Sequence, residues 1–221
     1  MTFDDLKKTF EEIKDMCKKL NKLPYLYITG GDPILHPNFW DLLEMCKKDD
    51  IPFTILGNPF HLTYENCKKM KELGCDKYQM SIDGLEKTHD WFRKPGSFKT
   101  TLEKIDCINK AGIKSVIMTT VSGTNIKEIP DIIDLVVKHK VRIFAFARYC
   151  PTSDEKDVGI EPLEYRKLLD TCWQKYKKYI KEDCYTRFNL KDHLWKLYLY
   201  EEGLYHIPED MKEGFVYDGC H

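Results

Sequence analysis

Strand-like and helix-like segments alternate along this chain, and that alternation limits the possible fold more than any other feature. Short apolar runs typical of buried strands begin near Tyr25, Ile51, Lys77, Lys114 and Val141. Apolar residues recur at helical spacing over 3–21, 38–49, 63–73, 97–111 and 126–138. Strand–helix units repeated in this way imply right-handed crossovers between parallel strands. We therefore predict an α/β fold built on one parallel sheet.

The predicted elements divide the chain into a core and a C-terminal extension. Asn125 and Glu128 have the spacing of a capping box, which would start the helix of 126–138. Pro162 opens a last long helix. Beyond residue 183 the periodic pattern stops, and aromatic residues interrupted by glycine and proline predict an irregular extension over 184–221. The expected core covers residues 1–183.

Composition excludes several classes of partner. The chain has 221 residues, and its 35 Lys and Arg residues against 36 Asp and Glu residues leave a formal charge of −1. No strong field therefore favours nucleic acid or an anionic membrane. No apolar run reaches the roughly 18 residues of a membrane helix, and the amphipathic N-terminus is unlike a signal peptide. The nine cysteines include no C-x-x-C pair, which argues against a disulfide framework. We expect a cytoplasmic protein.

Small and polar residues follow each predicted strand. The strand ends read Gly30-Gly31-Asp32-Pro33, Gly57-Asn58, Ser81-Ile82-Asp83-Gly84, Thr119-Thr120-Val121-Ser122 and Arg148. In a parallel barrel the carboxyl ends of the strands converge on one rim, where ligands bind. Each turn by itself is also consistent with a tight connection that binds nothing. Glycine turns before helices could instead hold a phosphate, so a phosphate-binding barrel enzyme remains an alternative.

Three motifs together resemble one enzyme family. Gly30-Gly31-Asp32-Pro33, then Ser81-Ile82-Asp83-Gly84, then His89-Asp90-Trp91-Phe92-Arg93 with Gly96-Ser97-Phe98 follow in this order. The string resembles the radical S-adenosylmethionine (radical SAM) enzymes, and most of all the branch that modifies peptides and proteins and carries a C-terminal SPASM domain. The resemblance covers residues 2–151. It implies a partial, parallel TIM-like barrel of the (βα)6 type, of which this chain would supply strands two to six.

The resemblance also implies a set of cofactor contacts. It assigns the S-adenosylmethionine pocket to Gly30, Gly31, Asp32, Pro33, Asn58, Ser81, Asp83, Arg93, Thr120, Val121 and Arg148. Asp32 would receive the ammonium group of the methionine moiety, and Arg93 would pair with its carboxylate. Thr120 and Val121 would lie near the ribose and adenine. Arg148 would face substrate or cofactor, or would form an ion pair on the barrel rim.

The chain departs from the family in its cysteines. The family holds a four-iron cluster through C-x-x-x-C-x-x-C, and no three cysteines here have that spacing. Such clusters require cysteine thiolates. The apolar strand at 25–29 also lacks a partner for one of its edges, although a parallel strand of this kind is normally paired on both. We interpret the chain as an N-terminally clipped piece that lacks the cluster ligands and is inactive alone. At the other end, Gly219-Cys220-His221 resembles the start of a SPASM domain, with Cys220 as an auxiliary-cluster ligand.

Two classes of function follow from this reading. In the first, the intact parent reduces S-adenosylmethionine with an electron from a separate one-electron donor. It then abstracts hydrogen from a peptide or protein through a deoxyadenosyl radical, with catalytic residues that the sequence does not identify. In the second, a catalytically inactive barrel serves as a peptide-binding or partner module. The coding sequence upstream of Met1 would separate the two.

Overall fold

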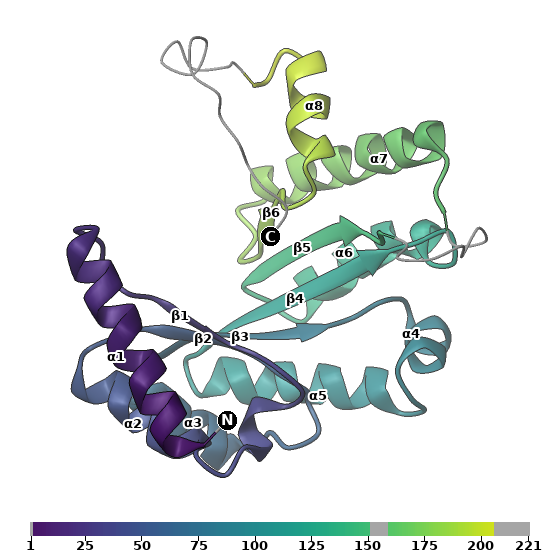
Figure 1. Ribbon diagram of the computed structural model, residues 1–221. Helices are drawn as coiled ribbons and strands as arrows, with labels where there is room; N and C mark the ends of the chain where they lie inside the picture. The colour runs from purple at the N-terminus through teal and green to yellow at the C-terminus, as the bar shows by residue number, and fades with distance from the viewer. Residues whose placement is uncertain (1, 151–158, 206–221) are drawn as a thin grey trace.

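Parallel strands laid side by side in chain order form the centre of the protein (Figure 1). The computed structural model describes residues 2–150 and 159–205. Its strands are β1 (Leu26–Ile28), β2 (Phe53–Leu56), β3 (Cys75–Ser81), β4 (Lys114–Val121), β5 (Ile143–Arg148) and β6 (Arg187–Asn189). They form one six-stranded sheet of order β1-β2-β3-β4-β5-β6, and every neighbouring pair is parallel. The predicted parallel α/β fold, a partial TIM-like barrel, is confirmed.

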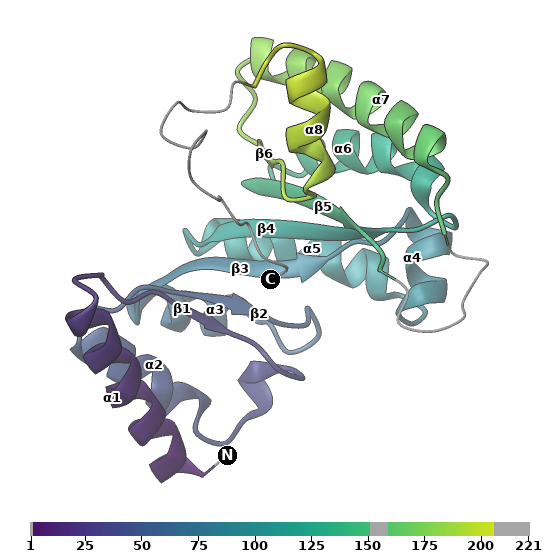
Figure 2. The ribbon, with the colours of Figure 1, turned by 45° about the horizontal axis from the view of Figure 1, so that its top comes forward.

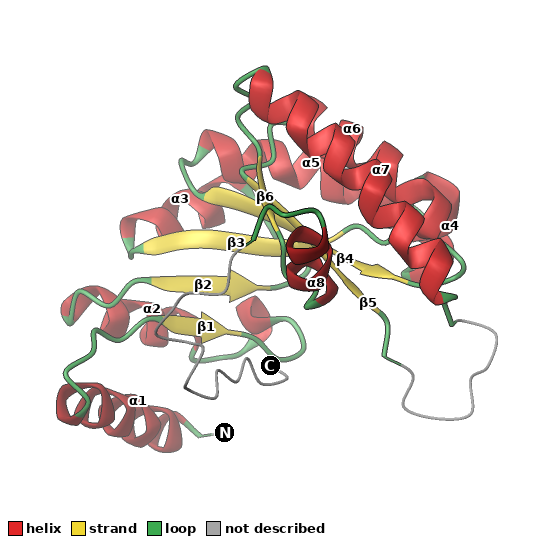
Figure 3. Ribbon diagram, turned by 90° about the horizontal axis from the view of Figure 1, so that it is seen from above, coloured by secondary structure: helices red, strands yellow, loops and turns green. Residues whose placement is uncertain are grey.

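Most of the helices connect consecutive strands and cover one face of the sheet (Figure 3). They are α1 (Phe3–Lys19), α2 (Phe39–Lys48), α3 (Tyr64–Glu72), α4 (Glu86–Phe92), α5 (Ser97–Lys110), α6 (Ile129–Lys138), α7 (Pro162–Lys181) and α8 (Leu194–Glu201), with short 3-10 turns η1 (Pro33–Leu35) and η2 (Ile126–Glu128). In α6, the residues Ile129, Ile132, Ile133 and Val136 recur at helical spacing and are buried. Within the described ranges, no helix is long and apolar enough to cross a membrane.

The two faces of the sheet differ in burial. On β3, Tyr78 and Met80 are buried, whereas Gln79 and Ser81, which alternate with them, are only half-buried. Because side chains alternate along a strand, one face packs under the helices and the other stays more open. Ser81, the last residue of β3, therefore points to the open side near the carboxyl end of the sheet.

Strand β1 is one of the two edge strands of the described sheet (Figure 2). Leu26 and Ile28 pair with Phe53 and Ile55 of β2, and no described strand pairs with the other side of β1. The unpaired edge expected from the sequence is confirmed for the described residues.

The chain after residue 183 is more regular than predicted in its described part. Arg187–Asn189 forms β6 beside β5, and Leu194–Glu201 forms α8. The strand is too short to show an alternating pattern, and its end residues are exposed and polar, so no sequence signal marked it. The sheet thus continues to residue 189, while residues 206–221, including Cys220, lie outside the described residues.

The predicted capping box at Asn125 and Glu128 is wrong. Asn125 Nδ2 instead donates to the carbonyl oxygens of Asp83 and Thr120. The carboxylate of Glu128 accepts hydrogen bonds from Leu85 N–H and from a side chain of α4. Both residues therefore brace the turn after β3 rather than the helix that follows them.

Candidate functional site

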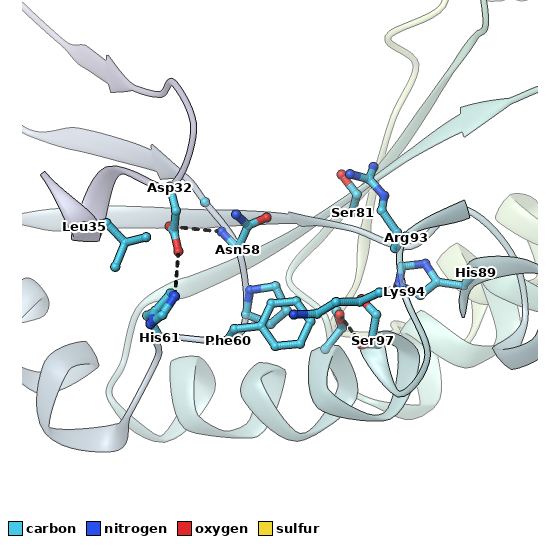
Figure 4. A pocket seen from close by; sticks show the side chains of 13 residues that line it. Asp32, Leu35, Asn58, Phe60, His61, Ser81, His89, Arg93, Lys94 and Ser97 are labelled. Carbon is cyan, nitrogen blue, oxygen red and sulfur yellow. Dashed lines mark hydrogen bonds and ion pairs between the residues drawn. The ribbon is translucent and has the colours of Figure 1, made fainter. Parts of the chain in front are cut away.

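A pocket of about 360 Å³ opens at the carboxyl ends of β1, β2 and β3 (Figure 4). Its wall is formed by Asp32, Leu35, Gly57, Asn58, Pro59, Phe60, His61, Ser81, His89, Arg93, Lys94, Ser97 and Thr101. The turns after the three strands supply most of these residues, as the barrel rim predicts. Of the residues proposed from sequence, this pocket brings together Asp32, Asn58, Ser81 and Arg93.

The glycine turn after β1 places Asp32 in the pocket. Gly30 and Gly31 have φ angles of +107° and +55°, which glycine adopts without steric penalty. Asp32 Oδ1 accepts a hydrogen bond from Asn58 N–H at 3.3 Å. The side chain is only 4% exposed.

The second carboxylate oxygen of Asp32 has no hydrogen-bond partner. His61 Nε2 lies 4.0 Å away, too far for a hydrogen bond. A buried carboxylate oxygen without a donor is unfavourable by roughly 1–3 kcal/mol. The pocket therefore suits a ligand that brings a donor or a positive charge to this oxygen.

Gly57 permits the close packing behind Asp32. A Cβ atom at this position would lie 2.3 Å from Tyr78 Oη and 3.1 Å from Asp32 Oδ1. The Tyr78 hydroxyl donates to the carbonyl oxygen of Asn58 at 3.2 Å, and the side chain is fully buried. Burial, together with the nearby charge of Asp32, raises the pKa of Tyr78. A neutral hydroxyl thus supports the Asn58 loop from beneath.

Arg93 lies on the opposite side of the pocket from Asp32 (Figure 4). Asp83 Oδ2 accepts hydrogen bonds from Arg93 Nε at 2.8 Å and from Arg93 Nη2 at 2.6 Å. Asp83 Oδ1 accepts another from Thr120 N–H at 2.9 Å. The Asp83 side chain is 6% exposed and that of Arg93 is 44% exposed. Asp83 therefore orients the guanidinium group, and Arg93 presents part of it to the pocket.

The two ends of the pocket suit opposite charges. Asp32 offers an unpaired carboxylate oxygen, whereas Arg93 offers a guanidinium group held in a fixed orientation. Charged hydrogen bonds of both kinds are stronger than neutral ones. A ligand that carries both a positive and a negative group suits such a pocket.

The other residues of the turn after β1 do not line this pocket. Gly30 and Pro33 line a separate groove of about 340 Å³ between α1 and β1. Gly31 is exposed and shapes the turn through its backbone. Their predicted roles as direct cofactor contacts stay predictions.

Predicted residues on the later strands are not part of the pocket wall. Thr120 touches the site only through its N–H bond to Asp83, and Val121 is fully buried. Arg148 pairs with the Asp192 carboxylate through Nε at 2.9 Å and through its backbone N–H at 3.0 Å. Of the two roles that the sequence analysis gave for Arg148, the structure contains the ion pair.

Several wall residues were not proposed from the sequence. Phe60 and His61 follow Asn58 in the same loop, and Lys94 follows Arg93. The Lys94 ammonium lies 3.3 Å from the centre of the Phe60 ring, so these two loops meet across the pocket. Their closeness in sequence to predicted residues was the only available signal.

The chain belongs to the radical SAM superfamily, whose sequence profile matches residues 2–136. Over 182 residues it is 29% identical to the AdoMet-dependent heme synthase of Methanosarcina barkeri, covering 80% of this chain and 50% of the relative. Over 108 residues it is 27% identical to the sporulation killing factor maturation protein SkfB of Bacillus subtilis, covering 48% of this chain and 26% of the relative. The chain spans about half the length of curated relatives such as this heme synthase.

The fold is similar to that of Streptococcus suis SuiB. The structure of SuiB bound to its precursor peptide SuiA superposes with a TM-score of 0.68 at 19% identity, covering 96% of this chain and 48% of that chain. SuiB bound to S-adenosylmethionine gives a TM-score of 0.66 at 19% identity, covering 86% of this chain and 45% of that chain. Family membership supports an enzyme, and it implies S-adenosylmethionine and an iron–sulfur cluster as cofactors.

The described residues suit the first cofactor and not the second. S-adenosylmethionine carries an ammonium and a carboxylate, and the pocket wall offers a carboxylate at Asp32 and a guanidinium group at Arg93. Within residues 2–150 and 159–205, no group of three histidine, cysteine or acidic side chains could hold a metal. Burial raises the pKa of Cys46, Cys67, Cys75 and Cys172 to about 12, so these thiols stay protonated at neutral pH.

Proposed function

We propose that this chain is the S-adenosylmethionine-binding part of a radical SAM enzyme, with Asp32 and Arg93 holding the methionine end of the cofactor. The observation that carries this proposal is the buried, unpartnered Oδ2 of Asp32 in a pocket whose other side presents Arg93. An ammonium group would give that oxygen the partner it lacks.

Bound S-adenosylmethionine, once reduced by one electron, supplies the radical that abstracts hydrogen in this superfamily. The residues of this chain bind and orient it. Asp32 accepts hydrogen bonds from the ammonium group, and Arg93, fixed by Asp83, donates to the carboxylate. Gly57 and Tyr78 hold the Asn58 loop in place beside Asp32. Ser81 lies on the pocket wall beside Arg93 (Figure 4), and we expect its hydroxyl to contact the ligand as well.

We also propose that these 221 residues do not turn over substrate by themselves, because their sequence contains no C-x-x-x-C-x-x-C motif. Thiolate ligands from outside this sequence would have to hold the cluster, which we expect to be of the four-iron type. A separate one-electron donor, in the cytoplasm, would supply the electron.

For the substrate we propose a peptide or protein. Two similarities support this choice: SuiB, solved with a precursor peptide, has a similar fold, and SkfB is named as a maturation protein. A tetrapyrrole is the second candidate, because the heme synthase of Methanosarcina barkeri covers more of this chain than SkfB does. Titration with an iron porphyrin separates the two. A saturable shift of the porphyrin absorbance would favour the tetrapyrrole, and no shift would favour the peptide.

Calorimetric titration with S-adenosylmethionine tests the pocket. Because each charged hydrogen bond contributes about 1.5–3 kcal/mol, Asp32→Ala and Arg93→Ala should each weaken binding by roughly 10- to 100-fold. Glu44→Ala is the matched control, since it removes an exposed carboxylate from α2, away from the pocket. If both pocket variants bind as tightly as the Glu44 variant, the cofactor site has been misplaced.

A further inference from the structure

His89 is a buried histidine in the pocket wall for which the proposed cofactor contacts supply no role. It lies on α4 between the end of β3 and the start of α5 and is only 1% exposed. Its Nδ1 accepts a hydrogen bond from Asp83 N–H at 3.0 Å. Its Nε2 lies 3.2 Å from the hydroxyl of Ser97, the first residue of α5. The ring thus joins two elements that border the pocket.

These contacts define the protonation state of the ring. A backbone N–H can only donate, so Nδ1 of His89 must be the unprotonated acceptor. The remaining proton is then on Nε2 and is donated to Ser97 Oγ. Burial lowers the pKa of His89, which favours the same neutral form. The ring is therefore a neutral connector with one acceptor and one donor, each used once.

The hydrogen bond to Asp83 connects His89 to Arg93. Asp83 is fixed on three sides: His89 accepts from its N–H, Asn125 Nδ2 donates to its carbonyl oxygen at 2.9 Å, and Thr120 N–H donates to its carboxylate. The same carboxylate then orients Arg93 through two hydrogen bonds. A change at His89 should reach the guanidinium group through Asp83.

The loop that carries Arg93 has a second anchor that does not involve the His89 ring. The carboxylate of Asp90 accepts hydrogen bonds from Gly96 N–H at 2.6 Å and from Phe98 N–H at 2.8 Å. These bonds hold the start of α5 when the imidazole is absent. Loss of the ring should therefore shift the Asp83 turn and the aim of Arg93 without unfolding the loop.

We propose that His89 is a positioning residue for the cofactor: through Asp83 it sets the direction in which Arg93 meets the carboxylate of the ligand. This inference rests on the proposed function, in which Arg93 binds the carboxylate of S-adenosylmethionine. It adds a specific consequence, because His89 should matter for a ligand that has the carboxylate and not for one that lacks it.

The test compares S-adenosylmethionine with decarboxylated S-adenosylmethionine by calorimetry. His89→Leu, which removes both hydrogen bonds, should bind S-adenosylmethionine about tenfold more weakly and the decarboxylated ligand with unchanged affinity. His89→Gln, which retains one acceptor and one donor, should keep most of the affinity. Ser115→Ala is the control: Ser115 is fully buried and bonded to Asn109 and Arg142, but it lies at the opposite end of β4.

The outcomes separate the inference from the proposed function. If the parent binds neither ligand, or binds both equally, the proposed function of the Arg93 pocket is wrong and the inference falls with it. If the parent prefers S-adenosylmethionine and His89→Leu keeps that preference, only the inference is overturned. An equal loss for both ligands would show a general structural role and would also overturn it.

Nitrogen NMR of the parent protein keeps the inference testable if His89→Leu does not fold. The expected spectrum shows His89 as a neutral ring with the proton on Nε2 and an unprotonated Nδ1. A proton on Nδ1 would contradict the bond to Asp83 N–H and with it the inference.

Discussion

Two buried carboxylates at the same end of the sheet differ in how well they are paired. Asp192, beside β5, is 3% exposed and accepts hydrogen bonds from Arg148 Nε, Arg148 N–H and Leu194 N–H. Asp32, after β1, is 4% exposed and accepts a single bond of 3.3 Å. Because native proteins normally pair their buried polar atoms, the unpaired oxygen at Asp32 distinguishes a binding site from a structural contact. The exposed fractions of the two side chains are nearly the same, so burial does not distinguish the two carboxylates.

The largest effect should come from breaking the paired carboxylate. Asp192→Asn removes the charge opposite Arg148, and we expect the free energy of unfolding to fall by about 3 kcal/mol. Asp134→Asn is the control: its carboxylate also pairs, with Lys175 and Tyr179, but it is 47% exposed. That variant should lose less than about 1 kcal/mol. Urea denaturation measures both, and equal losses would contradict the distinction between the buried and the exposed carboxylate.

A smaller loss should follow from crowding the unpaired carboxylate. In Gly57→Ala the new methyl group would meet Tyr78 Oη and Asp32 Oδ1, so we expect a destabilisation of about 2 kcal/mol. Adding Tyr78→Phe removes the nearest atom and should restore part of the stability. Thermal unfolding of the single and double variants checks this. No recovery in the double variant would mean that the Tyr78 hydroxyl is not the atom in conflict.

The stability of the protein should decrease in mild acid because of the buried histidine His89. Burial lowers the pKa of His89 below its usual value of about 6.5; Arg93 acts in the same direction, while Asp83 and Asp90 oppose it. The folded protein then binds fewer protons here than the unfolded chain. Its stability is complete above about pH 6.5 and falls as the pH drops below that value. Denaturation at about pH 7 and pH 5.5 should show a smaller decrease in His89→Gln than in the parent, whereas parallel decreases would assign the pH dependence to other groups.

The smallest and opposite effect is expected at Asp32. Asp32→Asn keeps an acceptor for Asn58 N–H but removes a buried charge whose second oxygen has no hydrogen-bond partner, so the free energy of unfolding should stay unchanged or rise by up to about 1 kcal/mol. Binding of S-adenosylmethionine should weaken at the same time. A clear loss of stability would show that the carboxylate is paired in solution and would remove the contrast with Asp192.

The fold was predictable from sequence where elements are long and periodic. Strand β4 was recognised from its apolar run, and helix α5 from apolar residues that repeat at helical spacing. Strand β6 was not, because Arg187–Asn189 is held by pairing with β5 and not by a pattern of its own. The capping box predicted at Glu128 was wrong for a different reason. Its spacing from Asn125 fits a cap, but its hydrogen-bond partners are 40 or more residues earlier in the chain.

The candidate site was predictable only in part. Asp32 and Arg93 were proposed because they belong to motifs, and both lie in the pocket. Nothing local distinguishes His61 or Lys94 from an exposed surface residue, so folding alone brings them to the site. The sequence also did not show whether Asp83 contacts a ligand or supports Arg93. In the structure its carboxylate accepts two hydrogen bonds from the Arg93 guanidinium group.

The sequential order of the strands also bears on how the chain is built. Each strand pairs with the strand that follows it in the sequence, from β1 to β6. Every pairing therefore closes a loop of a single crossover, and loop-closure entropy rises only slowly with loop length. Among the described strands, each finds a neighbour without a distant part of the chain. The described strands can therefore pair in the order in which they are synthesised, and the turn that carries Asp32 precedes the one that carries Arg93.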